Sequence, residues 1–167
     1  MGDDKPSSSK LSPLELGDLD ETGEAIDARA QIVAIAEAEI GLQDPDKYWQ
    51  LVCPQLMGNP HKVAWCGGFA LWCLRQAGLT DWSWQVWSGP GTPSGFLYHL
   101  LPTRHPKPGD MAYFFANQHH AIVKAYHGDS VDTIDGNSVP YPQEGVSVKT
   151  HLVKDVGCFY SIAQLIS

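Results

Sequence analysis

The first half of the chain carries apolar residues at helical spacing. They recur at three- and four-residue steps between residues 26 and 40 and stop at Gly41, so one face of a helix should pack on a core. The same spacing returns after residue 66 and ends at Gly78. Between these segments, residues 43–60 predict a short helix or turn around Tyr48. The first half is therefore expected to be helical.

The second half consists of short segments rich in strand-forming residues. Strands are expected over residues 111–115, 119–126 and 131–137, separated by turns, and again over residues 156–162. Helices followed by strands indicate an α+β fold, in which N-terminal helices pack on one antiparallel sheet.

Length and composition fit one domain. The chain has 167 residues and is 43% hydrophobic, which is ordinary for a globular protein. Residues 1–24 are rich in Ser, Asp, Glu and Gly and are expected to form a flexible arm, while residues 25–167 are expected to form a monomeric domain.

The sequence contains no run that approaches the roughly 18 apolar residues needed to span a membrane. The N-terminus shows no apolar signal-peptide segment. A net charge of −8 disfavours nucleic-acid binding, which needs a basic surface.

Cys66 stands where the later helix should begin. In a first turn, free backbone N–H groups and the helix dipole favour the thiolate, and the same N–H groups can receive an oxyanion. This position suits a nucleophile, although a free cysteine is often just a small core residue. Cys53, Cys73 and Cys158 lack the spacing of a disulfide framework or a zinc site and are expected in the core.

A histidine pair, His119 and His120, opens one predicted strand, and Asp135 ends the next. Adjacent antiparallel strands can place such positions side by side. A thiolate, an imidazole and a carboxylate form the arrangement of an activated nucleophile. Successive strand residues point to opposite faces, so one histidine of the pair is expected to face Cys66. The hydrophobic pattern leaves open which one.

Four motifs in this order resemble those of the CHAP group of the NlpC/P60 superfamily. These proteins are papain-like cysteine amidohydrolases and peptidases that act mostly on bacterial peptidoglycan. The motifs are Trp65-Cys66-x-x-Phe69, Pro108-Gly109-Asp110, the His-x-Ala-Ile-Val that begins at His119, and Ile134-Asp135-Gly136-Asn137. The resemblance runs from about residue 26 to the C-terminus and implies the papain-like NlpC/P60 (CHAP) fold. Gly67-Gly68 replaces a bulkier pair that is common in the family, which predicts a looser helix start.

The resemblance implies a role for each candidate residue. Cys66 matches the nucleophile and His119 the general base. Asp135 matches the acidic residue that orients the imidazole, and Asn137, two positions along, a further polar partner on the same strand face. The residues assigned to substrate binding are Tyr48, Trp65, Trp87 and His120.

The stretch from Trp82 to Trp87 has two interpretations. It is either a surface loop that packs its indoles on the core, or a groove wall that stacks on sugar rings or on the peptide stem. Both remain open from the sequence.

We expect no metal and no cofactor. Some relatives carry a carboxylate loop before the nucleophile, but residues 57–63 contain no acidic residue. Asp44 and Asp46, which flank a proline, are more typical of a helix start than of a calcium site. The histidines form no HExxH motif.

The expected function is peptidoglycan hydrolysis. An amide bond of the stem peptide or crossbridge would be cleaved, as by an N-acetylmuramoyl-L-alanine amidase or an endopeptidase, through a Cys–His–Asp thioester mechanism. A phage lysin or an antibacterial effector would be made in the cytoplasm and act on the wall after release, injection or virion delivery, with an immunity or delivery protein as partner. Two alternatives are a non-catalytic binding protein on the same fold and a cysteine amidase acting on a small amide outside the wall.

Overall fold

The computed structural model describes residues 27–58, 64–84, 95–137 and 145–166. Its α-helices are α2 (Ala28–Ala38), α3 (Pro45–Val52) and α4 (Cys66–Gln76). Single 3₁₀ turns are η1 (Pro54–Leu56), η2 (Gly95–His99), η3 (Val153–Asp155) and η4 (Ala163–Leu165). The predicted arm over residues 1–24 lies outside the described residues.

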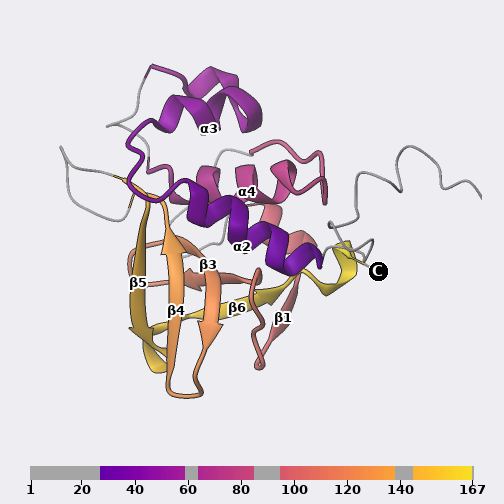
Figure 1. Ribbon diagram of the computed structural model, residues 1–167, viewed down its shortest axis with the longest axis vertical. Helices are drawn as coiled ribbons and strands as arrows, with labels where there is room; N and C mark the ends of the chain where they lie inside the picture. Colours follow the sequence, from indigo (N-terminus) through magenta and orange to yellow (C-terminus); the bar gives the residue numbers. More distant parts are fainter. Residues whose placement is uncertain (1–26, 59–63, 85–94, 138–144, 167) are drawn as a thin grey trace, which may run out of the picture.

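One sheet follows the helices. Its strands are β1 (Leu101–Thr103), β2 (Met111–Phe114), β3 (His119–Tyr126), β4 (Ser130–Asp135), β5 (Ser147–Leu152) and β6 (Cys158–Ser161). They lie in the order β1-β6-β2-β3-β4-β5, and every neighbouring pair is antiparallel. Figure 1 shows the helices gathered together on one side of the strands, with α4 between α3 and the sheet. The predicted α+β arrangement, helices packed on an antiparallel sheet, is confirmed.

The alternation of side chains divides the sheet between two apolar clusters. We call the side that meets the helices the helix face; it supplies Met111, Tyr113, Ile122 and Ile134 to the larger cluster. We call the opposite side the far face; its cluster consists of Ala112, Phe114, Ala121, Val123, Val131 and Phe159. Helix α4 is buried from Cys66 to Leu74, which accounts for its apolar residues on every side.

A buried ionic group ties α2 to α3. The Glu39 carboxylate is 6% exposed and accepts hydrogen bonds from Lys47 Nζ at 2.7 Å and from the Tyr48 hydroxyl at 2.9 Å. Lys47 Nζ also lies 5.1 Å from the centre of the Trp72 ring on α4, at cation–π distance. Lys47 and Tyr48, neighbours on α3, thus join α2, α3 and α4.

The Asp110 side chain stabilises the Pro108-Gly109-Asp110 turn by its hydrogen bonds. Asp110 is 1% exposed and accepts hydrogen bonds from the Lys107 and Ile162 backbone N–H groups at 2.8 and 3.0 Å. It also binds Arg29 Nη1 of α2 at 2.7 Å. Gly109 has φ +89, the left-handed region that glycine adopts without strain. One carboxylate therefore joins the first described helix, the entry to β2 and the C-terminal segment.

The sequence did not predict two of the strands. β1 has three residues and includes Pro102, which lacks a backbone N–H and is tolerated because the strand lies at the sheet edge. β5, at the other edge, has no buried residue, so it lacks the apolar face by which strands are recognised.

Candidate active site

Cys66 is the first residue of α4, as its spacing predicted, and Trp65 precedes it at the N-cap position. The thiol is nearly enclosed, since Cys66 is 4% exposed. Its backbone N–H and those that follow belong to the first turn, where no carbonyl of the helix can accept them. A thiol and backbone N–H groups that could bind an oxyanion thus occupy one helix end.

The two glycines after Cys66 allow close packing around it. A Cβ on Gly67 would lie 2.5 Å from Trp84 Cζ3 and 3.1 Å from His120 Cε1, and one on Gly68 would lie 2.5 Å from Trp49 Cζ3. Such distances leave no room for a side chain unless an aromatic ring moves. The helix runs continuously through both glycines. The departure from the family pattern therefore admits aromatic rings beside Cys66 and does not break the helix start.

His119 is held by a buried carboxylate. Its Nε2 lies 2.7 Å from Asp135 Oδ2, and Asp135 is 0% exposed at the end of β4. The hydroxyl of Thr133 donates a short hydrogen bond to the other oxygen, Oδ1. The predicted juxtaposition of His119 and Asp135 across neighbouring strands is thus present in the structure.

His120 also lies beside the thiol. Its Nδ1 is 3.6 Å from Cys66 Sγ, and the residue is 5% exposed. The imidazole stacks on Phe96, with ring centres 5.9 Å apart and planes inclined by 22°, and meets the edges or faces of Trp84 and Tyr113. His120 thus belongs to the helix face, among aromatic rings.

Both histidines act on the acidity of Cys66, which differs from the expectation that one would face it. Burial alone would raise the pKa of the thiol, but hydrogen bonds and charge from His119 and His120 outweigh burial and lower it to about 5. His119, as the first residue of β3, lies at the rim of the sheet, where its side chain can reach around to α4. Side chains point to opposite faces along the interior of a strand, but the first residue of a strand is less constrained. His119 stands at that first position.

His119 is in turn a strong base. Burial alone would lower the pKa of its imidazolium, but hydrogen bonds to Asp135 and to Cys66 raise it to about 10. Burial would raise the pKa of Asp135, yet hydrogen bonds from His119 and His151 hold it below its usual value. At neutral pH this combination favours a Cys66 thiolate beside a His119 imidazolium, stabilised by an ionised carboxylate.

Asn137 does not occupy the predicted strand position. β4 ends at Asp135, and Asn137 lies in the following turn with φ +54, a left-handed conformation that asparagine tolerates better than most residues. The period-two argument that put Asn137 on the face of Asp135 therefore fails, because the chain leaves the strand at Gly136. A Cβ on Gly136 would lie 2.8 Å from Phe69 Cβ, so this glycine lets the turn approach α4.

Two of the residues assigned to substrate binding are corrected by their burial. Tyr48 is 0% exposed, with its hydroxyl bound to Glu39, and Trp65 is 1% exposed. Their rings stack on each other with centres 5.6 Å apart, beneath the start of α4. They support the site from the core and cannot touch a substrate in this conformation. Trp87 lies outside the described residues.

The described part of the tryptophan stretch packs on the protein. Trp82 lies 4.8 Å from the His99 ring centre, and Trp84 contacts Trp49 as well as His120. Both indoles are only partly buried. For these two residues the packing interpretation holds, and Trp84 is also part of the wall around His120.

Sequence reasoning overlooked His151 and Thr133, both of which bind Asp135. His151 Nε2 lies 3.4 Å from Asp135 Oδ2, and its ring centre is 4.6 Å from that of Phe114. The signal was present, since Val148, Thr150 and Leu152 alternate with Ser147, Lys149 and His151 in the period of a strand. It was weak because neither set forms an apolar face.

Within the four described ranges, no group of three or more His, Cys, Asp or Glu residues is arranged to hold a metal ion. All four cysteines are free. None of the described helices combines the length and apolar character needed to cross a membrane.

The site thus combines a buried thiol at a helix start with two histidines, one of which is held by a carboxylate. This is an arrangement that can activate a cysteine as a nucleophile. The family model of the CHAP domain matches residues 58–137, in agreement with the resemblance that the motifs predicted. A CHAP domain implies amidase or peptidase activity of the peptidoglycan-hydrolase kind, typically dependent on a cysteine. No curated protein and no solved structure shows a significant match to the chain.

Proposed function

We propose that this protein is a cysteine amidohydrolase that cleaves an amide bond in the stem peptide or crossbridge of peptidoglycan, with a papain-like site. The observation that carries the proposal is the Cys66 thiol at the start of α4, with His120 Nδ1 at 3.6 Å and with His119 bound to the buried Asp135 at 2.7 Å. The pKa shifts agree with this geometry. The pKa of Cys66 is lowered to about 5 and that of His119 is raised to about 10, so a thiolate and an imidazolium coexist over the pH range between them. A cysteine retained only for packing would have no such partners.

The reaction begins with the thiolate. Cys66 Sγ attacks the amide carbon and forms a carbon–sulfur bond, while the carbonyl oxygen becomes an oxyanion beside the first backbone N–H groups of α4. One such donor is worth about 3 kcal/mol in other hydrolases. The oxyanion then collapses, the carbon–nitrogen bond breaks, and His119 gives its proton to the leaving amine.

Water completes the cycle. The neutral His119 takes a proton from a water molecule as that water attacks the thioester carbonyl, and Cys66 leaves as a thiolate. This regenerates the imidazolium. Asp135 holds Nε2 of His119 throughout, which directs the opposite ring nitrogen, Nδ1, toward the reacting atoms.

His120 has a supporting part in this proposal. Its imidazole lies beside Sγ and within the wall formed by Trp84, Phe96 and Tyr113. It acts as a second hydrogen-bonding partner of the thiolate and lines the substrate side of the site. No carboxylate contact is needed for that part, because the thiolate itself supplies the negative charge.

The biological setting belongs to the same proposal. Hydrolysis of the wall suits a phage lysin or an antibacterial effector that reaches the wall after release, injection or virion delivery. For an effector, an immunity protein would be expected to cover the Cys66 site.

The test is incubation of the purified protein with purified peptidoglycan, followed by mass spectrometry of the released fragments. The expected result is fragments that carry a new amine and a new carboxylate at one bond, and their masses identify that bond. Cys66→Ala should abolish release without loss of fold, because alanine is well tolerated early in a helix. Cys158→Ala is the matched control, since its thiol lies on β6 and donates to Phe159 O.

Each alternative predicts a different pattern. A binding protein on the same fold would retain peptidoglycan in a pull-down yet release no fragment. A small-amide amidase would hydrolyse soluble amides and leave peptidoglycan intact. Release that persists in Cys66→Ala would contradict a thioester mechanism altogether.

A further inference from the structure

Asp135 holds more donors than a single catalytic imidazole requires. Its side chain is completely buried at the end of β4, and Oδ1 accepts the Thr133 hydroxyl. Oδ2 is shared by two histidines, with His119 Nε2 at 2.7 Å and His151 Nε2 at 3.4 Å. The shorter contact belongs to the histidine beside the thiol, and the longer one to a histidine on a different strand.

His151 reaches this oxygen from the edge of the sheet. It lies on β5, with Val131 as its register partner on β4, and its side chain is 22% exposed. Its ring packs against Phe114 of β2, with ring centres 4.6 Å apart, and the centre of the Phe114 ring also lies 5.7 Å from that of His119. The two histidines thus share both the carboxylate oxygen and an aromatic neighbour.

We propose that His151 is a positioning residue of the hydrolase, which donates to Asp135 Oδ2 and thereby divides the charge of that oxygen between two imidazoles. The inference rests on the proposed function of Cys66 and His119. His151 does not reach the reacting atoms itself and acts only through Asp135.

The physical effect follows from the sharing of one oxygen. A second donor fixes the carboxylate in one orientation, which keeps the His119 ring directed at Cys66. It also draws electron density from Oδ2, so that His119 is held less tightly in its charged form. An imidazolium that releases its proton more readily is the better acid for the leaving amine.

The charged groups around His151 are few in the described residues. Asp135 faces it from β4 and His119 from β3. Lys149 lies two residues earlier on the same strand and, by alternation, on the same face. Phe114 of β2 adds no charge.

The experiment compares His151→Phe with His151→Gln. Phenylalanine keeps a ring against Phe114 and removes the donor, whereas glutamine keeps a neutral donor. With purified peptidoglycan, His151→Phe should lower kcat about tenfold, the usual loss for a hydrogen bond to a charged group, and leave KM within about twofold. His151→Gln should restore most of kcat.

A second measurement does not depend on any substrate. The rate at which iodoacetamide alkylates Cys66, read by mass spectrometry of the Cys66 peptide, is followed against pH. The alkaline step, where His119 loses its proton, should move upward by about one pH unit in His151→Phe, because Oδ2 then serves His119 alone. A residue that merely stabilised β5 would change the melting temperature and leave this step in place.

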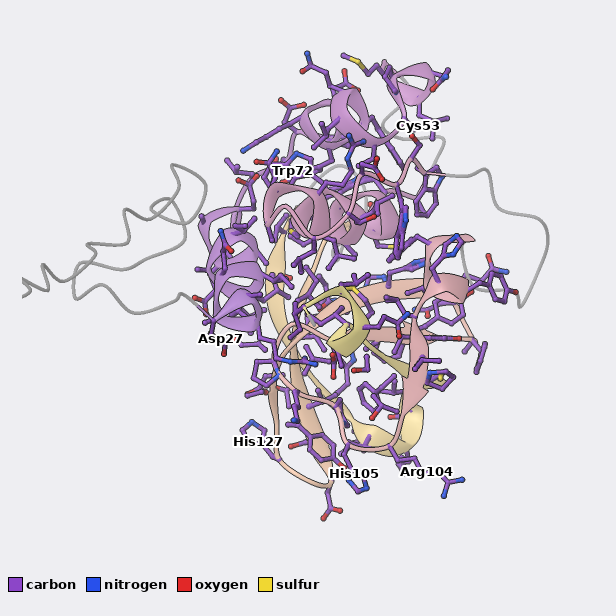
Figure 2. The ribbon with its side chains drawn as sticks, turned by 90° about the vertical axis from the view of Figure 1, so that its right-hand side faces the viewer. Asp27, Cys53, Trp72, Arg104, His105 and His127 are labelled. Carbon is purple, nitrogen blue, oxygen red and sulfur yellow. The ribbon has the colours of Figure 1, made fainter. Side chains whose placement is uncertain are left out.

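His127→Ala is the matched control. His127 Nε2 also pairs with a carboxylate, Asp132 Oδ2 at 2.8 Å, but it is exposed at the opposite end of the molecule from Trp72 of α4 (Figure 2). It should leave both measurements unchanged. The inference would be overturned if His151→Phe left kcat unchanged and left the alkaline step of Cys66 alkylation at the same pH as in wild type. If wild type released no fragments, the proposed function would fail, while the alkylation profile would still decide the role of His151.

Discussion

The two faces of the sheet surround their histidines in opposite ways. On the far face, His119 meets a buried carboxylate, which in turn binds Thr133 and His151. On the helix face, His120 lies among aromatic rings, and its Nδ1 is 3.6 Å from Cys66 Sγ. One imidazole is bound by a carboxylate, and the other is packed between aromatic rings.

The difference separates two roles that the sequence could not separate. A carboxylate partner fixes the tautomer of an imidazole and favours its charged form, which a base and acid catalyst needs. Aromatic rings fix the position of an imidazole by packing against it. In the proposed mechanism, adjacent residues of one strand therefore provide a proton carrier and a wall of the site for the same thiolate.

The strongest test of this comparison removes each histidine in turn. His119→Ala should lower kcat about 1,000-fold, because both the proton acceptor and the later proton donor are lost. His120→Ala should lower kcat by no more than about tenfold, because its 3.6 Å contact with Sγ is long and is worth no more than an ordinary hydrogen bond. Purified peptidoglycan and fragment release under saturating substrate provide the measurement.

His120→Phe serves as the control for packing. It keeps a ring between Phe96 and Tyr113 and removes only the nitrogen near Sγ. If it matches wild type while His120→Ala is impaired, the wall matters more than the hydrogen bond. A dead His120 variant beside an active His119 variant would reverse the assignment.

Much of this site was readable from the sequence because its signals are local. A helix start at Cys66 follows from the spacing of apolar residues, and the α4 boundary agrees with it. The nearness of His119 and Asp135 follows from two antiparallel strands joined by a short turn. Both arguments need only neighbouring segments of the chain.

The rest depended on contacts that periodicity does not encode. Tyr48 and Trp65 were given to substrate, but their rings are buried beneath α4, a placement decided by how α3 packs on α4. Asn137 was misplaced because the strand ends two residues earlier, at Asp135, and Asn137 itself lies in a turn with positive φ. His151 was missed because β5 joins β4 at an exposed edge, where sequence shows no apolar face.

The pH dependence of kcat/KM sharpens the comparison further. Activity needs a Cys66 thiolate, which forms as pH rises through about 5, and a His119 imidazolium, which is lost as pH rises through about 10. The profile should therefore be bell-shaped, with limbs near these two values. Asp135→Asn should move the alkaline limb to lower pH, because the carboxylate raises the pKa of His119.

His120, on the helix face, should affect the acidic limb of the pH profile. His120→Ala should move the acidic limb to higher pH, since His120 helps to lower the pKa of Cys66. It should leave the alkaline limb where it is. A profile in which both variants shifted the same limb would contradict the division of roles between the two faces.

The smallest effect concerns two glycines that leave room for an aromatic ring, Gly67 and Gly157. Gly67→Ala would place a Cβ 2.5 Å from Trp84 Cζ3 and 3.1 Å from His120 Cε1. Trp84 is packed against Trp49, Phe96 and His120, so it cannot swing away freely. Overpacking of this kind costs about 1–3 kcal/mol, of which the better helix propensity of alanine recovers at most about 1 kcal/mol.

The matched control is Gly157→Ala. Its Cβ would lie 2.7 Å from Phe115 Cε2, but Phe115 is 47% exposed and its ring can turn into solvent. Urea unfolding should show a clear loss of stability for Gly67→Ala and a change below about 1 kcal/mol for Gly157→Ala. Equal losses in the two variants would mean that the rings around His120 are no more constrained than an exposed side chain.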